Sequence, residues 1–188
     1  RYGQAFTYSF GTSGANRTAM VTLTGGGSKY YVVDPAQRTL LSRRNEEMET
    51  ETFAYDGQGR VTQITYPEGN YITYTYDGRS NMTQSSRVAK PGSGDGTTTI
   101  SLGFPAGCTS STPTCNQAIW SRDAKGTQTD YVNGLIEDEY YIDETRFPAA
   151  AVGGDRLVIR KKYSQIIGQI ITDANWQEPS GVVGTELT

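Results

Sequence analysis

The sequence predicts an all-β protein made of tandem antiparallel β-hairpins, and three observations lead to this fold class. Tyr outnumbers Phe by 13 to 5, and Gly accounts for 22 of the 188 residues. Aromatic side chains favour half-buried strands, while Gly favours the tight turns between them. The third observation is an internal repeat, because residues 64–77 align without a gap on residues 21–34. Self-similarity of this kind is typical of repeat architectures.

The repeat is marked by an aspartate that recurs at spacings of 22 and 21 residues, namely Asp34, Asp56 and Asp77. A polar residue stands four positions after each of them, namely Arg38, Arg60 and Asn81, and Arg17 extends this column toward the N-terminus. The repeat therefore covers residues 8–87. Each period predicts two strands and two turns of a continuous antiparallel meander.

The unit over residues 61–76 shows these elements most clearly. Residues 61–66 and 71–76 alternate in polarity, so each predicts a strand. Pro67 and Gly69 lie between them and predict a turn, because Pro presets φ at the second turn position and Gly accepts a positive φ.

Alternation also predicts which side chains share a face of the sheet. We expect one face to bury Ile72, Tyr74 and Tyr76, together with Tyr30 and Val32 of an earlier repeat. The opposite face is expected to hold Thr73 and Thr75.

After each repeat aspartate we expect a turn in which the carboxylate accepts hydrogen bonds from backbone N–H groups two or three residues further on. Gly59 and Gly126 stand three residues after Asp56 and Asp123, so we expect a positive φ at both. Calcium binding is the alternative use of such aspartates. Turn capping is preferred because no Asp-x-Asp-x-Asp loop occurs.

Composition divides the chain into three segments. Residues 1–87 carry the β-hairpin repeats. Residues 88–118 form an insertion rich in Gly, Pro, Ser and Thr, which we expect to be a long surface loop with one strand over residues 97–104. Residues 119–188 hold degenerate repeats and a C-terminal β region. In that region helix and strand both stay open, because four β-branched residues recur at helical spacing, namely Ile166, Ile167, Ile170 and Ile171.

The two cysteines, Cys108 and Cys115, lie close together with Pro113 between them. Two thiols cannot complete a four-ligand zinc site in a chain without histidine, so no metal or other cofactor is expected. A local disulfide is preferred to a reduced pair, and it would imply an oxidising location.

Composition also argues against several function classes. A net charge of −3 and a pI near 5.0 give no basic surface for nucleic acid. No apolar run approaches the roughly 18 residues that cross a bilayer. The lack of histidine excludes Ser-His-Asp and Cys-His catalysis within the chain. Because the chain begins at Arg1, with neither Met nor a leader, we expect a segment of a longer protein.

The charged clusters receive structural interpretations. Acidic residues at 46–51 and 137–139 lie in apparent strands and predict solvated faces rather than a pair of glycosidase carboxylates. The arginines of the repeat column predict a ladder beside neighbouring Asp or Tyr side chains rather than an anion site. Residues 25–29 (GGGSK) lack the spacing and the following helix of a phosphate-binding loop.

Residues 55–62 (YDGQGRVT) with residues 65–70 (TYPEGN) closely resemble the YD repeat of bacterial RHS and toxin-complex proteins. The shared pattern is Tyr-Asp, two variable residues, Gly-Arg, a strand, and Pro-x-Gly. Residues 120–131 resemble a further copy, with Arg122 in place of the Tyr. The positions marked as a structural signature are Asp34, Arg38, Tyr55, Asp56, Gly59, Arg60, Pro67, Gly69, Tyr76, Asp77, Asn81, Asp123 and Gly126.

Three positions depart from the pattern of this family. Gln37 and Ser80 stand where the repeat has Gly, and Val33 replaces the Tyr before Asp34. We therefore expect the turns at these positions to be distorted.

The resemblance implies a secreted or cell-surface bacterial protein in which coils of β-ribbon form a hollow shell, often around a toxic C-terminal domain. Such a shell is not an enzyme. The partners implied are neighbouring repeats of the same or a longer chain, with self-assembly into fibres as a variant. The alternative is a carbohydrate-binding or adhesion module that uses the Tyr-rich face. Residues 178–182 are a weak echo of the family's self-cleaving Asp-Pro-x-Gly-Leu stretch, and no protease activity is assigned to them.

Overall fold

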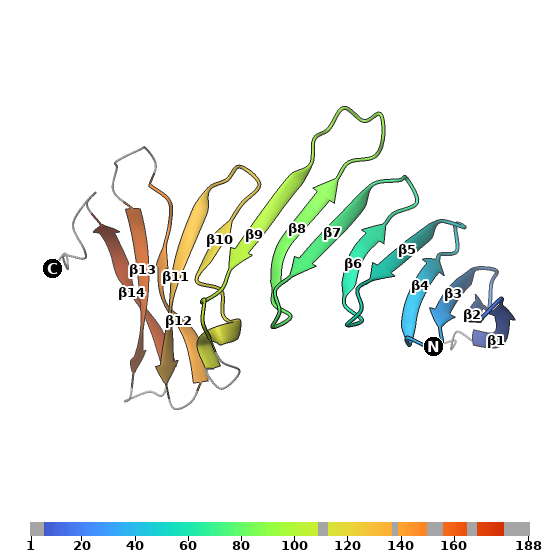
Figure 1. Cartoon of the computed structure of the whole chain (residues 1–188), viewed down its shortest axis with the longest axis horizontal. Coiled ribbons are helices and arrows are strands. Elements are labelled where there is room, and N and C mark those ends of the chain that lie inside the picture. The colour runs from blue at the N-terminus through green and yellow to red at the C-terminus, as the bar shows by residue number, and fades with distance from the viewer. Residues whose placement is uncertain (1–5, 109–112, 137–138, 150–155, 165–168, 179–188) are drawn as a thin grey trace. The chain divides into compact units, whose positions relative to one another are not determined.

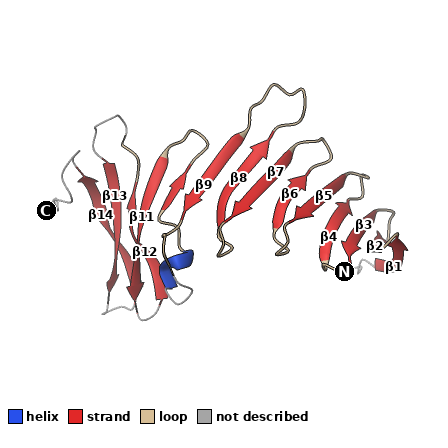
Figure 2. Ribbon diagram, viewed as in Figure 1, coloured by secondary structure: helices blue, strands red, loops and turns tan. Residues whose placement is uncertain are grey.

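The computed structural model describes residues 6–108, 113–136, 139–149, 156–164 and 169–178. Its strands, β1 to β14, belong to one sheet in which the strand order is the chain order (Figure 1). In the described residues the one helical element is a short 3-10 helix, η1 (Pro113–Asn116), and all else is strand or loop (Figure 2). The predicted all-β class of tandem hairpins is therefore confirmed.

The chain forms two compact units. The first consists of Arg1–Thr75 and Ser85–Thr98, and the second of Tyr76–Gln84 and Thr99–Thr188. The strands whose residues lie wholly or mainly in the first unit are β1 (Phe6–Ser13), β2 (Asn16–Leu23), β3 (Ser28–Asp34), β4 (Thr39–Arg44), β5 (Thr50–Tyr55), β6 (Val61–Thr65) and β7 (Tyr71–Tyr76). The strand β8 (Met82–Val88) is divided between the units. The segment boundaries at 87 and 118 stay a sequence-based prediction.

The remaining strands lie in the second unit, except that Thr98, the first residue of β9, belongs to the first. They are β9 (Thr98–Gly103), β10 (Trp120–Arg122), β11 (Gln128–Ile136), β12 (Glu139–Arg146), β13 (Arg156–Ser164) and β14 (Gln169–Glu178). The strand expected over residues 97–104 is thus present as β9. Ile170 and Ile171 lie in β14, so the open choice between helix and strand is settled as strand there. Ile166 and Ile167 lie outside the described residues, as does most of the echo at 178–182.

Cross-strand register in the first unit gathers apolar side chains on one face, which we call the aromatic face. Phe53 pairs with Ile64, and Ile64 pairs with Ile72, so the three side chains form a row across β5, β6 and β7. Ile72 is 9 % exposed. Tyr74 shares this face with Ile72, while Thr73 pairs with Gln63 on the other face, as the alternation predicted.

The expectation that Tyr30 and Val32 share the face of Tyr74 is wrong. Tyr31 pairs with Arg43, which pairs with Glu51, and this register places Tyr31 on the aromatic face with Phe53. Tyr30 pairs with Arg44 on the opposite face. The cause is an offset of one residue, because the gapless alignment of the repeats equates Tyr74 with Tyr31.

Few apolar side chains are buried in the described part of the chain. They are Ile72 in the first unit and Cys115 and Val158 in the second. Globular domains usually bury a core between at least two layers of secondary structure. Among the described strand residues, most side chains are instead half-buried on a single sheet. No helix of the described residues is long and apolar enough to cross a membrane.

Candidate functional site

The turn after β5 is built around the carboxylate of Asp56. Its Oδ1 accepts hydrogen bonds from the backbone N–H groups of Gln58 and Arg60, at 2.9 and 3.0 Å. Its Oδ2 accepts a charged hydrogen bond from Nε of Arg60 at 2.7 Å. The N–H of Gly59 donates to the carbonyl of Asp56 at 3.0 Å, and the φ of Gly59 is 77°. The positive φ expected at Gly59 is confirmed, and it completes a common three-residue hairpin loop.

The turn after β7 repeats this arrangement around Asp77. Its Oδ1 accepts from the backbone N–H groups of Arg79 and Asn81, both at 2.9 Å, and its Oδ2 accepts from Nδ2 of Asn81 at 2.9 Å. Ser80 has a φ of 71° and so takes the left-handed conformation that a glycine takes in the Asp56 turn. The distortion expected at Ser80 is therefore wrong, because the hydrogen bonds around Asp77 hold a residue other than glycine in this uncommon conformation.

The turn after β3 does depart from this geometry, as Gln37 predicted. Asp34 Oδ1 accepts from the N–H groups of Ala36 and Gln37, at 2.8 and 3.2 Å. The left-handed residue is Arg38, with a φ of 57°. Asp34 pairs with Thr39 across the hairpin, so this loop is one residue longer than that of Asp56.

Asp123 builds the same turn as Asp56. Its Oδ1 accepts from the N–H groups of Lys125 and Thr127, at 2.9 and 2.8 Å. Gly126 has a φ of 84°, so the positive φ expected there is confirmed. Asp77 follows the odd-numbered β7 and Asp123 follows the even-numbered β10, so within the second unit the two turns lie at opposite ends of the strands (Figure 1).

The turn predicted at Pro67 and Gly69 is present. The N–H of Tyr66 donates to the carbonyl of Asn70 at 2.9 Å, and the N–H of Gly69 donates to the carbonyl of Tyr66 at 3.0 Å. Gly69 has a φ of 86°. The loop therefore has the geometry of the Asp56 turn without its carboxylate.

Tyr55, the signature tyrosine before Asp56, links two strands through its hydroxyl group. The hydroxyl donates to the carbonyl of Leu40 at 2.9 Å. The backbone pairing of β4 with β5 ends at Ser42 and Thr52. Beyond that pair, the Tyr55 hydroxyl bonds the Leu40 carbonyl and so continues the link between the two strands. Val33 stands at the equivalent position of the preceding repeat and has no hydroxyl to make this bond.

Hydrogen bonding lowers the pKa of the turn aspartates. The backbone N–H of Arg60 holds the pKa of Asp56 below its ordinary value, and the backbone N–H of Thr127 does the same for Asp123. Burial raises the pKa of Asp77, but the hydrogen bonds from Asn81 and Arg79 outweigh it and lower the pKa overall. These carboxylates stay ionised at neutral pH, which suits a turn cap and does not suit a general acid.

The predicted arginine ladder does not form at its first two positions. Arg17 and Arg38 are exposed, and neither has an ion pair among the described residues. Arg60 contacts the aspartate of its own turn. The acidic residues Glu46, Glu47 and Glu49 are exposed, as predicted, but they lie in the loop between β4 and β5 and not in a strand. Residues 137–138 of the other acidic cluster lie outside the described residues.

The disulfide preferred from the sequence is present between Cys108 and Cys115, whose Cα atoms lie 5.5 Å apart. Cys115 lies in η1 and is 2 % exposed. The loop returns to the sheet where the N–H of Ile119 donates to the carbonyl of Gly103 at 2.8 Å. We call residues 104–119 the disulfide loop. The Asp77 turn joins β7 to β8, and the next connection at the same end of the strands joins β9 to β10. The disulfide loop forms this connection in place of a short turn.

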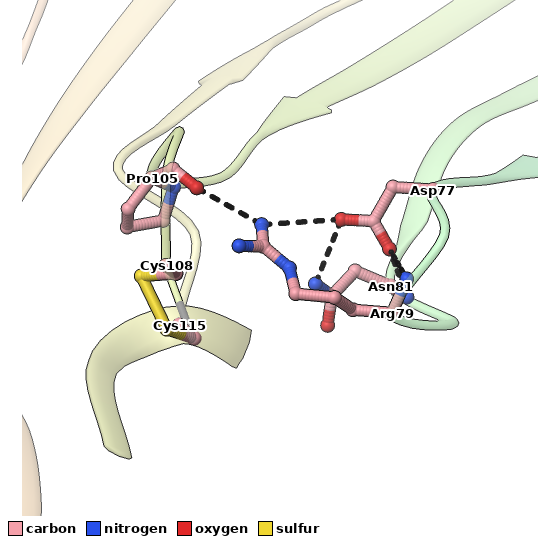
Figure 3. Close-up of a disulfide and its surroundings, with 6 residues drawn as sticks. All are labelled: Asp77, Arg79, Asn81, Pro105, Cys108 and Cys115. Carbon is pink, nitrogen blue, oxygen red and sulfur yellow. Dashed lines mark hydrogen bonds and ion pairs between the residues drawn. A yellow bond between two sulfur atoms is a disulfide. The ribbon is translucent and has the colours of Figure 1, made fainter. Parts of the chain in front are cut away.

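Arg79 joins the Asp77 turn to the disulfide loop (Figure 3). Its Nη2 donates to the carbonyl of Pro105 at 3.0 Å and lies 3.3 Å from Oδ2 of Asp77. The sequence pattern treats Arg79 as a variable position, so motif reasoning missed it. A hollow of 490 Å³ lies between the turn and the loop and is lined by Asp77, Arg79 and Cys108, among others.

Two further contacts in the second unit carry no signal in the repeat pattern. Gly103 pairs with Trp120, and the indole ring fills the space that a Cβ at Gly103 would need. Arg156 Nη2 lies 2.6 Å from Oδ2 of Asp130, and its Nε donates to the carbonyl of Phe147 at 2.9 Å. Both contacts link chain segments that are distant in sequence.

A second hollow, of 590 Å³, lies on the aromatic face of the first unit and is lined by the tyrosines Tyr31 and Tyr66. Arg43 on its wall pairs with Glu51 at 2.7 Å and lies 5.7 Å from the centroid of the Phe53 ring. Its other lining residues include two amide side chains and a further carboxylate, Asn45, Asn70 and Glu49. The lining also holds the cations Lys29 and Arg44 and the carboxylate Glu68, so three positive charges face three negative ones. The hollow therefore offers hydrogen bonds and two rings rather than net charge.

Among the described residues, no group of three or more His, Cys, Asp or Glu side chains could hold a metal ion. Each repeat aspartate is hydrogen-bonded within its own turn.

Comparison with known proteins identifies the repeated turns. Residues 34–71 and 55–90 each match a family model described as RHS Repeat. No curated protein matches the chain in sequence. The matched residues contain the Asp34, Asp56 and Asp77 turns and the Pro67–Gly69 turn described above. Residues 34–90 are therefore similar to the RHS repeat, and through them the chain resembles RHS/YD-repeat proteins.

Proposed function

We propose that this chain is a non-catalytic structural segment of a secreted or cell-surface RHS-type protein, whose sheet forms part of the wall of a shell or surface fibre. The observation that supports the proposal is the small number of buried apolar side chains in the described part of the chain. A sheet whose described residues include so few buried apolar side chains gains stability by adding repeats along the chain.

The chemistry of the repeat aspartates supports a structural role. Each carboxylate of the Asp56, Asp77 and Asp123 turns accepts backbone hydrogen bonds within its own loop. Each Oδ1 is thereby committed to holding its own turn, which is the role of a structural cap. The disulfide supports an oxidising, extracytoplasmic location.

The proposal is tested by adding repeats. A second copy of residues 8–87 fused in register ahead of the chain should raise the melting temperature and the urea m-value, because new sheet interface is formed. The matched control is the same fusion with the aspartates at 34, 56 and 77 of the added copy replaced by Gly. Equal stability of the fusion, its control and the original chain would contradict a repeat that depends on its neighbours.

A second candidate is carbohydrate binding, and the 590 Å³ hollow favours it. Neither the Tyr31 nor the Tyr66 hydroxyl has a hydrogen-bond partner among the described residues, and Arg43 and Glu51 neutralise each other. A neutral ligand rich in hydroxyl groups would fit such a wall by stacking and hydrogen bonding.

Saturation-transfer NMR with uncharged oligosaccharides tests this second candidate. Tyr66→Ala should abolish the signal, while Tyr71→Ala, the same change near the same end of the sheet but on the opposite face, should leave it unchanged. Absence of signal with the unmodified chain would remove the candidate and leave the structural role standing.

A further inference from the structure

The sequence contains three Asp-Gly pairs, namely Asp56–Gly57, Asp77–Gly78 and Asp95–Gly96. In such a pair the backbone nitrogen of the glycine can attack the side-chain carboxyl carbon of the aspartate, because glycine has no side chain to obstruct the approach. The N–Cγ bond forms, the Cγ–OH bond breaks, and the amide proton leaves with the hydroxyl group as water. Water then opens the resulting succinimide ring, and opening at the main-chain carbonyl leaves an isoaspartate of unchanged mass.

Two of the three pairs lie in the capped turns described above. The Oδ1 atom of Asp56 accepts two backbone hydrogen bonds, at 2.9 and 3.0 Å, and that of Asp77 accepts two at 2.9 Å. The carbonyls of these aspartates also accept, at 3.0 Å from the N–H of Gly59 and at 3.1 Å from the N–H of Ser80. Ring closure has to break such bonds, because the carboxyl carbon must turn toward the nitrogen of the next residue.

The protonation state of the carboxyl group opposes the reaction in the same two turns. Ring closure starts from the neutral carboxyl group, because its hydroxyl group has to leave as water. The backbone N–H of Arg60 holds the pKa of Asp56 below its ordinary value, and the pKa of Asp77 is lowered as well. At neutral pH the neutral fraction of both side chains is therefore smaller than that of an ordinary aspartate.

The third pair lies in the loop between β8 and β9 and lacks these restraints. Asp95 and Gly96 are both exposed, and the Asp95 carboxylate has no hydrogen bond or ion pair among the described residues. The N–H of Asp95 donates to Oγ of Ser93 at 3.1 Å, a bond that leaves the carboxyl group free to turn. A Cβ placed at Gly94 or Gly96 would meet nothing within 4 Å, so the loop has room for the ring.

We propose that Asp95–Gly96 is a site of spontaneous isoaspartate formation in the folded chain, and that the turn caps suppress the same reaction at Asp56 and Asp77. The modification adds one carbon to the main chain. In the loop after β8 this carbon lies outside the strand pairing, whereas at Asp56 it would displace the N–H groups that the carboxylate caps. The caps thus protect the repeat turns chemically as well as holding their shape. This inference goes beyond the structural role proposed above and does not depend on it.

Peptide mapping of aged protein tests the proposal. Trypsin does not cut between Lys90 and Pro91, so the three pairs fall on separate peptides, residues 45–60, 61–79 and 88–122. The full chain is kept for weeks in neutral buffer and, in parallel, in concentrated guanidinium chloride. After reduction and digestion, electron-transfer fragmentation measures isoaspartate in each peptide, and the unchanged mass separates it from deamidation of an asparagine. The denatured sample is the matched control, because the same three pairs are present without the turns.

In buffer, isoaspartate should form in the 88–122 peptide at least about tenfold faster than in the other two, since two or more hydrogen bonds oppose ring closure there. In guanidinium chloride the three rates should agree within about twofold, because unfolding removes the caps. Asn81→Ala removes the side-chain bond to Asp77 Oδ2 and should raise the rate in the 61–79 peptide by about fivefold, the equivalent of one hydrogen bond, with the 45–60 peptide as internal control. Equal rates in buffer, a difference that persists in the denaturant, or an unchanged rate at Asp77 in Asn81→Ala would each overturn the proposal.

Discussion

The guanidinium of Arg79 donates to the carbonyl of Pro105 while it lies 3.3 Å from the carboxylate of Asp77. One side chain therefore fixes the disulfide loop to a repeat turn. Arg79→Ala should lower the free energy of unfolding by about 1 kcal/mol, the usual net value of a partly buried hydrogen bond. Urea denaturation measures it, and Arg87→Ala, at an exposed arginine of β8, is the control. Equal urea midpoints for the two variants would show that the contact contributes nothing.

The disulfide should stabilise the same loop. Cys108 and Cys115 are 7 positions apart in the sequence. Closing a loop of this size should contribute roughly 2 to 3 kcal/mol, so the double change Cys108→Ser and Cys115→Ser should lower the urea midpoint accordingly. Intact-mass measurement after thiol alkylation checks the bond itself, and two freely alkylated cysteines in unreduced protein would disprove it.

Gly59 should tolerate substitution poorly because of its backbone angle alone. Its φ is 77°, and a Cβ placed there would meet nothing within 4 Å, so a side chain adds strain without a clash. Gly59→Val should cost about 1 to 3 kcal/mol. Gly96→Val, in an open loop position without a positive φ, is the control. Thermal melting compares the two, and identical melting temperatures would argue against the turn assignment.

The two faces of β7 should respond differently to truncation. Tyr74 lies on the aromatic face beside the Phe53, Ile64 and Ile72 row, whereas Thr73 lies opposite Gln63 on the other face. The Tyr74 ring is half-buried rather than buried as expected. Tyr74→Ala should therefore lower the free energy of unfolding by about 1 to 2 kcal/mol, and Thr73→Ala by less than about 1. Urea denaturation measures both, and equal losses would contradict the assignment of faces.

The turn aspartates should make stability depend on acid pH. The pKa of Asp56, Asp77 and Asp123 is lowered in the folded chain from an ordinary value of 3.8. A lowered folded pKa means that their contribution is complete above the unfolded value and is lost as pH falls through the folded one. Urea midpoints between about pH 6 and pH 2 should therefore fall more steeply for the unmodified chain than for Asp56→Asn. Parallel pH curves for the two proteins would show that Asp56 does not contribute.

The repeat signature made the strands and turns predictable because each is decided locally. The glycines at 59 and 126 predict a positive φ at their own positions, and the alternation over residues 71–76 predicts a strand. Ser80 shows the limit of this reasoning, since the ring of hydrogen bonds around Asp77 replaces the conformational freedom of Gly. The expectation for Tyr30 failed because a shift of one residue moves a side chain to the opposite face.

Contacts between separate hairpins could not be predicted in the same way. Arg79 with Pro105, Gly103 with Trp120 and Arg156 with Asp130 join residues that no shared period relates. Each depends on how the disulfide loop and the later strands return to the sheet. That path is decided by tertiary packing, and the residues at its contacts carry no local pattern.

A sheet whose strand order equals its chain order has a low contact order. Each hairpin needs the closure of a short loop of a few residues, a step that takes microseconds, and no distant partner has to be found. During synthesis, each repeat can therefore fold onto the previous strand as soon as it leaves the ribosome, well before the rest of the chain exists. The disulfide loop is the exception, since it must wait for oxidation, and it divides an otherwise continuous folding process into an early and a late stage.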